Sequence, residues 1–269
     1  MLLTRHAFRD GFIWCVDGHT LPTAMTLNDL LQMEAENMLR HLQESPHART
    51  HDRVAPIEPN QEVWASGVTY LRSRVERESE SSTADVYAKV YEAERPELFF
   101  KSIGWRAKGD GDNIRIRKDS SWNVPEPELT LVINSRQQIV GYTIGNDVSS
   151  RSIEGENPLY LPQAKTYDGS CALGPGIIIA SVDQMADLSI ELEIWRKDDS
   201  VFKESTTIAQ MKRSLNELVG FLFQEMTFPN GVFLMTGTGI VPPSPFTLEV
   251  DDHVMIRIGD LTLSNIVAS

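Results

Sequence analysis

The chain is poor in the features that mark several common classes of protein. It has only two cysteines in 269 residues, too few for a disulfide framework or a cysteine-rich zinc site. No stretch approaches the roughly 18 consecutive apolar residues of a membrane-spanning helix. The amino-terminal residues also lack the apolar segment of a signal peptide. We therefore expect a cytoplasmic protein that has no membrane partner.

Basic residues are scarce as well. Lys and Arg number 25 against 38 Asp and Glu, which gives a formal charge of −13. A nucleic-acid partner requires a basic surface, and an anionic membrane surface attracts basic segments, so this balance argues against both. It does not exclude a small anionic substrate held by a few local cations. The 41% hydrophobic content is ordinary for a globular protein that buries a sizeable core.

Several familiar catalytic motifs are missing from the sequence. It has no G-x-S-x-G elbow, no Walker loop and no G-x-G-x-x-G after a strand. All histidines except His253 lie within residues 1–58, without metal-ligand partners nearby, so we expect no histidine-built zinc site. The segment GDGDN at 109–113 is predicted to be a turn, because the later positions of a calcium loop are absent.

The pattern of the chain predicts a β-rich α+β fold with a small amino-terminal α+β segment, residues 1–58, and a main domain, residues 59–269. In the first part, 11–18 is typical of a strand, and 26–42 of a helix that Thr26 caps with Asp29 three residues later. Residues 55–62, with two prolines, are predicted to be a linker.

The main domain alternates short apolar strands with turns and shows no regular βα repeat, which favours a β-rich class. A helix is predicted over 208–226. The charged stretch 72–97 interrupts two apolar segments. Such a stretch is either a solvated face or a mobile lid over a pocket, and both interpretations stay open.

Two glutamates stand before an apolar run in the stretch NVPEPELTLVIN, residues 123–134. From Glu128 onward the alternation predicts a strand, so Glu126 and Glu128 project to the same side. Their Cα atoms would lie roughly 6–7 Å apart at about 3.3 Å per residue. Two like charges this close require a counter-charge.

Further acidic and basic residues follow along the chain. Asp147 ends an apolar segment, Arg151 comes four residues later, Lys165 follows, and Thr238 lies in a glycine-flanked loop. Each has an ordinary structural explanation when taken alone. Glu126, Glu128 and Asp147 together offer three hard oxygen donors that suit Mg²⁺, Mn²⁺ or Ca²⁺. Arg151, Lys165 and a divalent ion would leave one net positive charge, which suits a mono-anionic substrate.

These residues resemble the motifs of the fumarylacetoacetate hydrolase family from about Trp64 to the carboxyl terminus. Its E-x-E and downstream D-x-x-x-R correspond to Glu126, Glu128, Asp147 and Arg151, and its lysine and G-T loop to Lys165 and 237–238. The resemblance implies a mixed, rolled β-sheet, a homodimer and Mg²⁺ held by the three carboxylates at strand ends. It also implies a 2-keto acid substrate that Lys165, Arg151 and Thr238 hold or activate.

One departure from the family bears on the reaction type. Hydrolases of this family carry an H-x-x-E pair in the lid, and here Ser73 occupies the histidine position while Glu76 keeps the glutamate. The sequence around this pair is similar to the branch that dehydrates 2-keto-3-deoxy sugar acids, such as 2-keto-3-deoxy-D-arabinonate. The resemblance implies a metal-dependent hydro-lyase in which Lys165 is the base or proton carrier, Glu76 is the acid for the leaving hydroxyl and Ser73 contacts substrate.

Two alternatives remain open at this point. One is hydrolysis of a C–C bond in an acylpyruvate or a 2,4-diketo-3-deoxy acid, which would require a water activator other than the missing histidine. The other is a protein that binds a 2-keto acid or a metal without turnover.

Overall fold

The computed structural model describes residues 1–8, 11–22, 25–43, 53–71 and 84–269. Its strands are β1 (Leu2–Phe8), β2 (Gly11–Val16), β3 (His19–Thr20), β4 (Arg53–Val54), β5 (Glu62–Gly67), β6 (Glu97–Ile103), β7 (Asn113–Arg115), β8 (Asn123–Val124), β9 (Pro127–Ile133), β10 (Ile139–Asp147), β11 (Ser149–Ser150), β12 (Cys171–Ile179), β13 (Ser189–Arg196), β14 (Asp199–Thr207), β15 (Val232–Met235), β16 (His253–Ile258) and β17 (Leu261–Ala268). Its helices are α1 (Leu27–Leu31), α2 (Ala35–Gln43), α4 (Ala84–Glu92), α5 (Arg151–Glu156), α6 (Leu161–Lys165), α7 (Val182–Met185) and α8 (Leu215–Phe223), with short 3-10 helices η1 (Gly104–Arg106), η2 (Pro158–Tyr160) and η3 (Ile208–Gln210).

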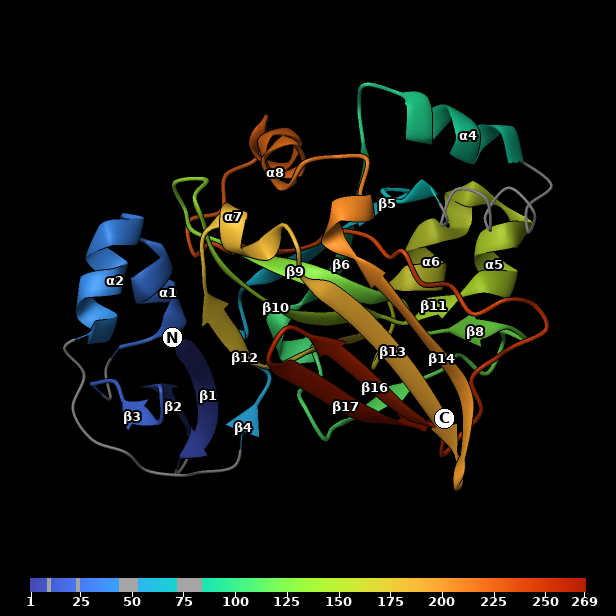
Figure 1. Ribbon diagram of the computed structural model, residues 1–269, viewed down its shortest axis with the longest axis horizontal. Helices are drawn as coiled ribbons and strands as arrows, with labels where there is room; N and C mark the ends of the chain where they lie inside the picture. Colours follow the sequence, from blue (N-terminus) through green and yellow to red (C-terminus); the bar gives the residue numbers. More distant parts are fainter. Residues whose placement is uncertain (9–10, 23–24, 44–52, 72–83) are drawn as a thin grey trace.

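Two sheets form the body of the molecule (Figure 1). The larger follows the order β3-β2-β1-β12-β10-β9-β15-β5-β6, with β4 beside β1, and the smaller follows β14-β13-β16-β17-β7. The described neighbours are antiparallel apart from the pairs β15–β5 and β17–β7, which are parallel. The predicted β-rich α+β class with a mixed sheet is confirmed.

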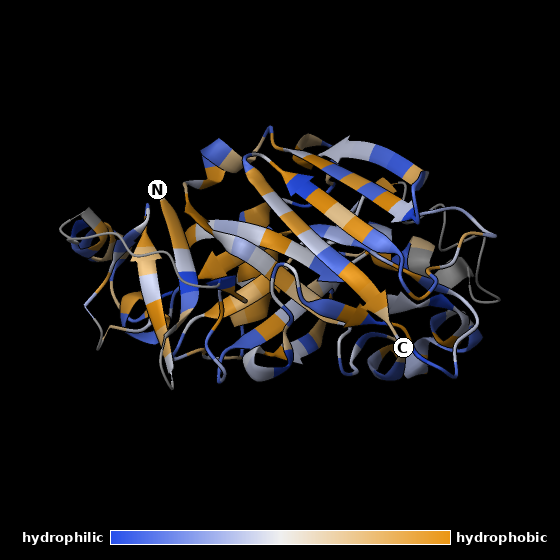
Figure 2. Ribbon diagram, turned by 90° about the horizontal axis from the view of Figure 1, so that it is seen from below, coloured by the Kyte–Doolittle hydropathy of each residue, from blue (hydrophilic) through white to orange (hydrophobic). Residues whose placement is uncertain are grey.

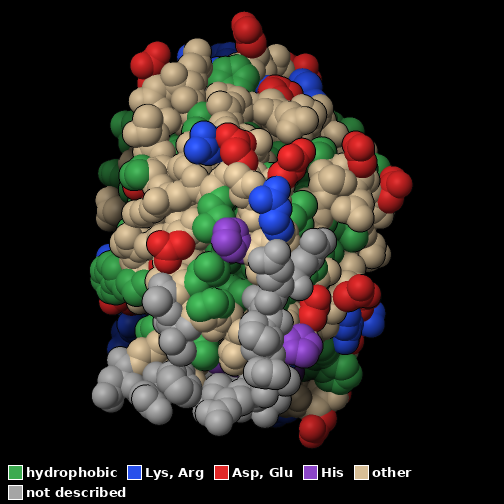
Figure 3. Space-filling view, turned by 90° about the vertical axis from the view of Figure 1, so that its left-hand side faces the viewer, with side chains coloured by type: hydrophobic (Ala, Val, Ile, Leu, Met, Phe, Trp, Pro, Cys, Tyr) green, Lys and Arg blue, Asp and Glu red, His purple; other side chains and the backbone are tan. Residues whose placement is uncertain are grey.

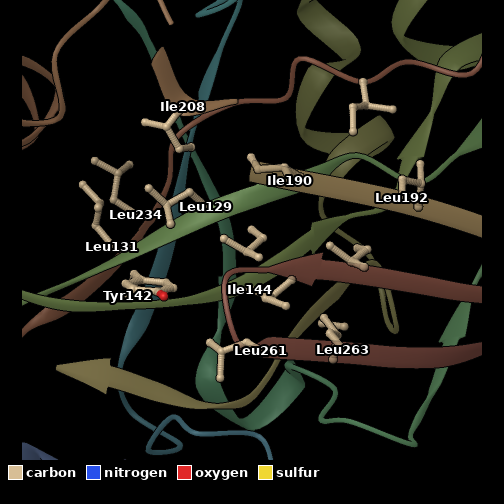
Figure 4. Close-up of a cluster of buried hydrophobic side chains, with 14 of the residues drawn as sticks. Leu129, Leu131, Tyr142, Ile144, Ile190, Leu192, Ile208, Leu234, Leu261 and Leu263 are labelled. Carbon is tan, nitrogen blue, oxygen red and sulfur yellow. The ribbon is translucent and has the colours of Figure 1, made fainter. Parts of the chain in front are cut away.

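The main apolar core lies between the two sheets (Figure 4). One face of β9 and β10 contributes Leu129, Leu131 and Ile144, and the smaller sheet contributes Ile190 and Leu263, all 0% exposed. The smaller sheet turns its other face outward, so buried and exposed residues alternate along β17. Figure 2 shows the matching stripes of hydropathy on the strand that ends at the carboxyl terminus. This alternation is the period-2 pattern of a half-buried strand.

The opposite face of the larger sheet is covered at one end by α1 and α2. Leu30 and Met38 from these helices pack against Val132 of β9 and Phe233 of β15 in a second buried cluster. Figure 1 places α1 and α2 at one end of the molecule and α5 and α6 at the other. These two helices therefore do not cover the other end of this face, where β10 stops at Asp147.

The single helix predicted over 26–42 is wrong in one respect, because the structure has two helices there. The predicted capping box of Thr26 and Asp29 is present at the start of α1. The break follows Leu31, whose carbonyl oxygen accepts a hydrogen bond from the backbone N–H of Ser135 at 2.8 Å. Asn134 Nδ2 donates to the backbone oxygen of Met33 at 2.9 Å. The loop between β9 and β10 therefore takes carbonyl groups that a continuous helix would use.

The segment 55–62, which the sequence predicts to be a linker, is packed into the molecule. Ile57 is 0% exposed and Gln61 is 1% exposed, so the segment is part of the interior. Glu58 accepts a hydrogen bond from Trp14 Nε1 at 2.7 Å and pairs with Arg5 at 3.2 Å. Strand β1 also pairs with β12 of the main domain, so the amino-terminal strands extend the larger sheet. The division into residues 1–58 and 59–269 stays a prediction.

The helix predicted over 208–226 is shorter in the structure. It is replaced by η3 and by α8, which begins after Ser214. The Ser214 hydroxyl accepts a hydrogen bond from the backbone N–H of Glu217 at 3.2 Å. A serine cap of this kind fixes where a helix starts, since it satisfies an N–H group of the first turn.

The proposed lid, residues 72–97, is described only from residue 84 onward. Its described part forms α4, and the segment before α8 holds the end of this helix. Arg213 Nη2 donates to the backbone oxygen of Ala93 at 2.6 Å, and its Nη1 donates to that of Glu94 at 2.9 Å. Lys212 pairs with Glu92 at 2.9 Å. The choice between a lid and a solvated face stays a prediction.

The surface agrees with the acidic composition. On the face shown in Figure 3, acidic side chains are scattered among the described residues and no broad basic patch is visible. Within the described residues, no helix combines the length and apolar character that crossing a membrane requires.

Candidate metal centre and active site

Three carboxylates meet where β9 begins and β10 ends. The two strands pair so that Gly145 lies opposite Glu128 and Asn146 opposite Pro127. The backbone N–H of Asp147 then donates to the backbone oxygen of Glu126 at 2.9 Å. Carboxylate oxygens of Glu126, Glu128 and Asp147 all lie within 4.8 Å of one another. The predicted clustering of these three residues is confirmed.

Two glycines let the backbone approach this cluster. A Cβ on Gly145 would lie 2.3 Å from the hydroxyl oxygen of Thr130, so a larger residue opposite Glu128 would force neighbouring side chains to move. Gly237, with φ +91°, donates its backbone N–H to Glu128 Oε2 at 2.5 Å. A positive φ is a conformation that glycine adopts without strain. The glycine-flanked loop therefore contributes a hydrogen bond to one of the carboxylates.

The electrostatics of the cluster are dominated by burial. Glu126 is 2% exposed, and Glu128 and Asp147 are each 1% exposed. Burial, followed by the charges of Asp147 and Glu126, raises the pKa of Glu128 well above its ordinary value, although Lys165 and the Gly237 N–H oppose the shift. A buried carboxylate in this position requires additional positive charge to stay ionised.

Lys165, the last residue of α6, provides part of that charge. Its Nζ lies 2.8 Å from Glu126 Oε2 and 2.9 Å from Asp147 Oδ2, and it donates to the hydroxyl of Ser149 at 2.6 Å. The same Nζ lies 5.6 Å from the centre of the Phe99 ring. The ammonium group therefore bridges two of the three carboxylates from inside the cluster.

Arg151 opens α5 and sits behind the carboxylates. Its Nη2 lies 3.0 Å from Glu126 Oε1, and its Nε lies 4.0 Å from Glu154 Oε2. Both Arg151 and Glu154 are buried. The structure thus brings Arg151 to the predicted cluster as a partner of Glu126.

A small cleft opens beside the three carboxylates. Its described lining residues are Ser66, Gly67, Val68, Phe99, Glu126, Glu128, Asp147, Lys165 and Thr238. Thr238 and Lys165 therefore both face the space that the sequence predicts for substrate, whereas Arg151 is not among these lining residues. Val68 has φ 54°, a conformation rare for a β-branched residue. Strained backbone of this kind clusters at ligand sites.

The predicted lid residues Ser73 and Glu76 lie outside the described residues. The roles given to them, contact with substrate and donation of a proton, stay predictions.

Two residues near the cluster were missed by the sequence reasoning. Lys101 of β6 is 0% exposed, and its Nζ pairs with Asp147 Oδ1. Ser149 follows β10 and accepts the hydrogen bond from Lys165. A lysine within the apolar segment 98–105 was a signal that could have found Lys101, because a buried lysine requires a charge partner. With Lys101 included, three cations accompany the three carboxylates.

The residues present fit a divalent cation. The donors are carboxylate oxygens, the ligands that Mg²⁺, Mn²⁺ and Ca²⁺ prefer, and they converge from two adjacent strands. Burial, followed by the charges of Asp147 and Glu126, raises the pKa of Glu128, and a bound divalent cation would favour its ionised form. Glu126, Glu128 and Asp147 are therefore the residues that would hold such an ion.

Comparison with known proteins agrees with this geometry. The family model described as fumarylacetoacetate (FAA) hydrolase C-terminal matches residues 62–268. The chain is 48% identical over 221 residues to a probable 2-keto-3-deoxyxylonate dehydratase of Haloferax volcanii, covering 81% of this chain and 76% of the relative. It is 43% identical over 212 residues to the 2-dehydro-3-deoxy-D-arabinonate dehydratase of Saccharolobus solfataricus, covering 77% of this chain and 70% of the relative.

A solved structure is similar over nearly the whole chain. It is described as 2-keto-3-deoxy-D-arabinonate dehydratase complexed with magnesium and 2,5-dioxopentanoate. It is 34% identical, covers 99% of this chain and 98% of its own, and superposes with a TM-score of 0.80. The family match and the two relatives together carry the assignment. The chain belongs to the fumarylacetoacetate hydrolase family.

Proposed function

We propose that this protein is a Mg²⁺-dependent hydro-lyase that dehydrates a 2-keto-3-deoxy sugar acid, such as 2-keto-3-deoxy-D-arabinonate, to a 2-keto acid semialdehyde. The observation that carries the proposal is the buried cluster of Glu126, Glu128 and Asp147, which faces a cleft that also holds Lys165. The two dehydratase relatives support the substrate class, and the magnesium complex of the similar structure supports the metal.

The reaction requires a proton to leave C3 and a hydroxyl group to leave C4. Mg²⁺ held by the three carboxylates would supply a Lewis acid for the C1 carboxylate and the C2 oxygen, which makes the C3 protons more acidic. Lys165 is our candidate for the group that takes or carries the C3 proton, because it lines the cleft and its Nζ lies 2.8 Å from Glu126 Oε2. Proton transfer of this kind requires the catalytic group within hydrogen-bond reach of the reacting atom.

The C4 hydroxyl group leaves with a proton as water. Glu76 is our candidate for the acid that supplies this proton. A shift of hydrogen from C5 to C3 then converts the unsaturated alcohol to an enol, and transfer of the enol hydroxyl proton to C4 gives the aldehyde, so that the atoms balance to one water lost. Thr238 and Ser73 are proposed to contact the substrate, and Arg151 to keep Glu126 in place beside the bound carboxylate.

Product analysis tests the proposal directly. Purified protein is incubated with 2-keto-3-deoxy-D-arabinonate and Mg²⁺, and the semialdehyde is detected by mass spectrometry after derivatisation. We expect semialdehyde with Mg²⁺ and none in excess EDTA. A parallel incubation with an acylpyruvate detects hydrolysis, since C–C cleavage releases two acids. Hydrolysis without dehydration, or tight binding of both compounds without turnover, would falsify the proposal.

The oligomeric state, the location and the range of metal ions are also proposals. We propose a homodimer in the cytoplasm that acts on a small 2-keto acid and binds no nucleic acid, with Mn²⁺ or Ca²⁺ as possible substitutes for Mg²⁺. Light scattering coupled to size exclusion tests the dimer, and a metal panel in the dehydration assay ranks the ions. A monomeric mass at working concentration would contradict the dimer.

A further inference from the structure

We propose that Lys101 is a positioning residue of the metal site, and that its ammonium group holds Asp147 and the end of α6 in the geometry that metal binding requires. The proposal rests on the proposed function, because it assumes that Asp147 is a metal ligand.

Lys101 is completely buried. Its side chain is 0% exposed although it comes from β6, the terminal strand of the larger sheet. Its neighbours differ, since Phe100 is 37% exposed and Ser102 is 1% exposed, and Lys101 itself falls where the register of the β5–β6 pair shifts. A lysine ammonium has three donors and no acceptor, and burying it costs free energy unless those donors are used.

The partners of Lys101 come from two segments of the site. Lys101 Nζ pairs with Asp147 Oδ1 and donates to the backbone oxygens of Val148 and Lys165. The two carbonyl oxygens use two of the three ammonium donors, and the Asp147 carboxylate supplies the opposite charge. The three partners belong to Asp147 at the end of β10, to Val148 directly after it and to Lys165, which lines the cleft. One side chain on β6 therefore ties together the two segments that build the site.

The cations of the site contact different oxygens of the carboxylates. Asp147 uses Oδ1 for Lys101 and Oδ2 for Lys165. Glu126 likewise uses Oε1 for Arg151 and Oε2 for Lys165. Lys165 lines the cleft, whereas Lys101 and Arg151 are not among its described lining residues. If Lys165 turns toward substrate, Asp147 still has Lys101 to fix the orientation of its second oxygen.

A positioning role and a simple charge role predict opposite results for metal binding. If Lys101 acted only through its charge, replacing it with a neutral residue would tighten Mg²⁺ binding, because a nearby positive charge would be gone. If it acts through geometry, the same change weakens Mg²⁺ binding. Partners that orient metal ligands typically contribute about 10–100-fold to metal affinity or activity.

The experiment measures Mg²⁺ binding by calorimetry on metal-stripped protein. We compare wild type with Lys101→Met, which keeps most of the unbranched side chain and removes the ammonium group, and with Lys101→Arg, which keeps the charge and changes the geometry. Lys118→Met is the matched control, because Lys118 is exposed. We expect the Kd for Mg²⁺ to rise about 10–100-fold in both Lys101 variants, with kcat at saturating Mg²⁺ lowered to a similar extent. We expect the control to match wild type.

The possible outcomes separate the proposals. An unchanged or tighter Kd in folded Lys101→Met, or a wild-type Kd in Lys101→Arg, overturns the positioning role. If Lys101→Met does not fold, Lys101→Arg decides alone, and failure of both to fold also overturns the proposal, because Lys101 would then be a determinant of the fold. Absence of Mg²⁺ binding in the wild type would instead contradict the proposed function.

Discussion

The two faces of β9 and β10 are equally buried but opposite in chemistry. One face presents Leu129, Leu131 and Ile144 to the smaller sheet, all 0% exposed, while the other ends in Glu128 and Asp147, each 1% exposed. Burial of an apolar side chain is favourable by itself, at about 1.5–3 kcal/mol for a leucine. Burial of a carboxylate is unfavourable unless it is paired and hydrogen-bonded. Exclusion from water therefore does not distinguish core from site in this protein, whereas the supply of counter-charge does.

The largest expected effect comes from removing one charged ligand. We expect Glu126→Gln to lower dehydration to the background rate, because the metal loses a carboxylate oxygen. The far-UV circular dichroism should stay that of wild type, since Glu126 lies before β9 rather than in the apolar core. Glu156→Gln, at an exposed glutamate, is the control and should keep full activity. Full activity of the Glu126 variant, or of wild type in excess EDTA, would show that the buried carboxylates do not hold a metal that the reaction requires.

The next largest effect is expected at Glu76, and it tests whether the buried carboxylates need an acid from the proposed lid, residues 72–97. If Glu76 supplies the proton for the leaving hydroxyl, Glu76→Gln should lower kcat by about 10²–10⁴. KM should change much less, because the metal still binds C1 and C2 of the substrate. Steady-state kinetics on a 2-keto-3-deoxy acid measures both constants.

Undiminished kcat in this variant would remove Glu76 from the mechanism. The companion change Ser73→His restores the hydrolase-like H-x-x-E pattern. We expect it to impair dehydration, and an assay with an acylpyruvate shows whether it also introduces slow C–C cleavage.

A substitution on the apolar face should reduce stability and leave the reaction rate unchanged. Leu131→Ala should reduce the free energy of unfolding by about 2–5 kcal/mol, since it removes buried methyl groups and leaves a cavity between the sheets. Below the unfolding transition, kcat should match wild type, because the side chain points away from the carboxylates. Urea denaturation measures the first quantity and steady-state kinetics the second. A folded Leu131→Ala enzyme with a strongly reduced kcat would show that the two faces are coupled.

The smallest expected effect is a pH dependence of stability that comes from the titration of Glu128. Its pKa is raised in the folded protein, first by burial and then by the charges of Asp147 and Glu126. A raised carboxyl pKa contributes stability that is present below the unfolded pKa, about 4.3, and lost as the pH rises through the folded pKa. Metal-free wild type should therefore become less stable relative to Glu128→Gln as the pH increases above that range.

Thermal unfolding in EDTA measures this difference. We expect Glu128→Gln to have the higher Tm at about pH 8 and the gap to narrow toward about pH 5. Comparing the two proteins at each pH cancels the general effect of net charge. A gap that does not change with pH would show that Glu128 is not the titrating group.

The alternation of apolar and polar residues along the chain allowed several features of the site to be predicted. The alternation from Glu128 to Asn134 predicts β9, and the period of two places Glu126 and Glu128 on one side. Asp147 could be found because it ends an apolar strand, and Lys165 and Thr238 because the family motif marks them. The strand and the shared side of the two glutamates depend on residues close together in the chain, so they can be inferred without knowing which strands are neighbours.

Only the tertiary structure decided the features that depend on strand order and packing. Lys101 reaches Asp147 because β6 and the end of β10 converge in space, and no spacing in the sequence encodes that approach. The N–H of Gly237 reaches Glu128 for the same reason. The helix predicted at 26–42 breaks after Leu31 because the loop between β9 and β10 takes its carbonyl group. Periodicity specifies which way a side chain points along its own strand, whereas the counter-charge it meets is set by segments that are distant in the chain.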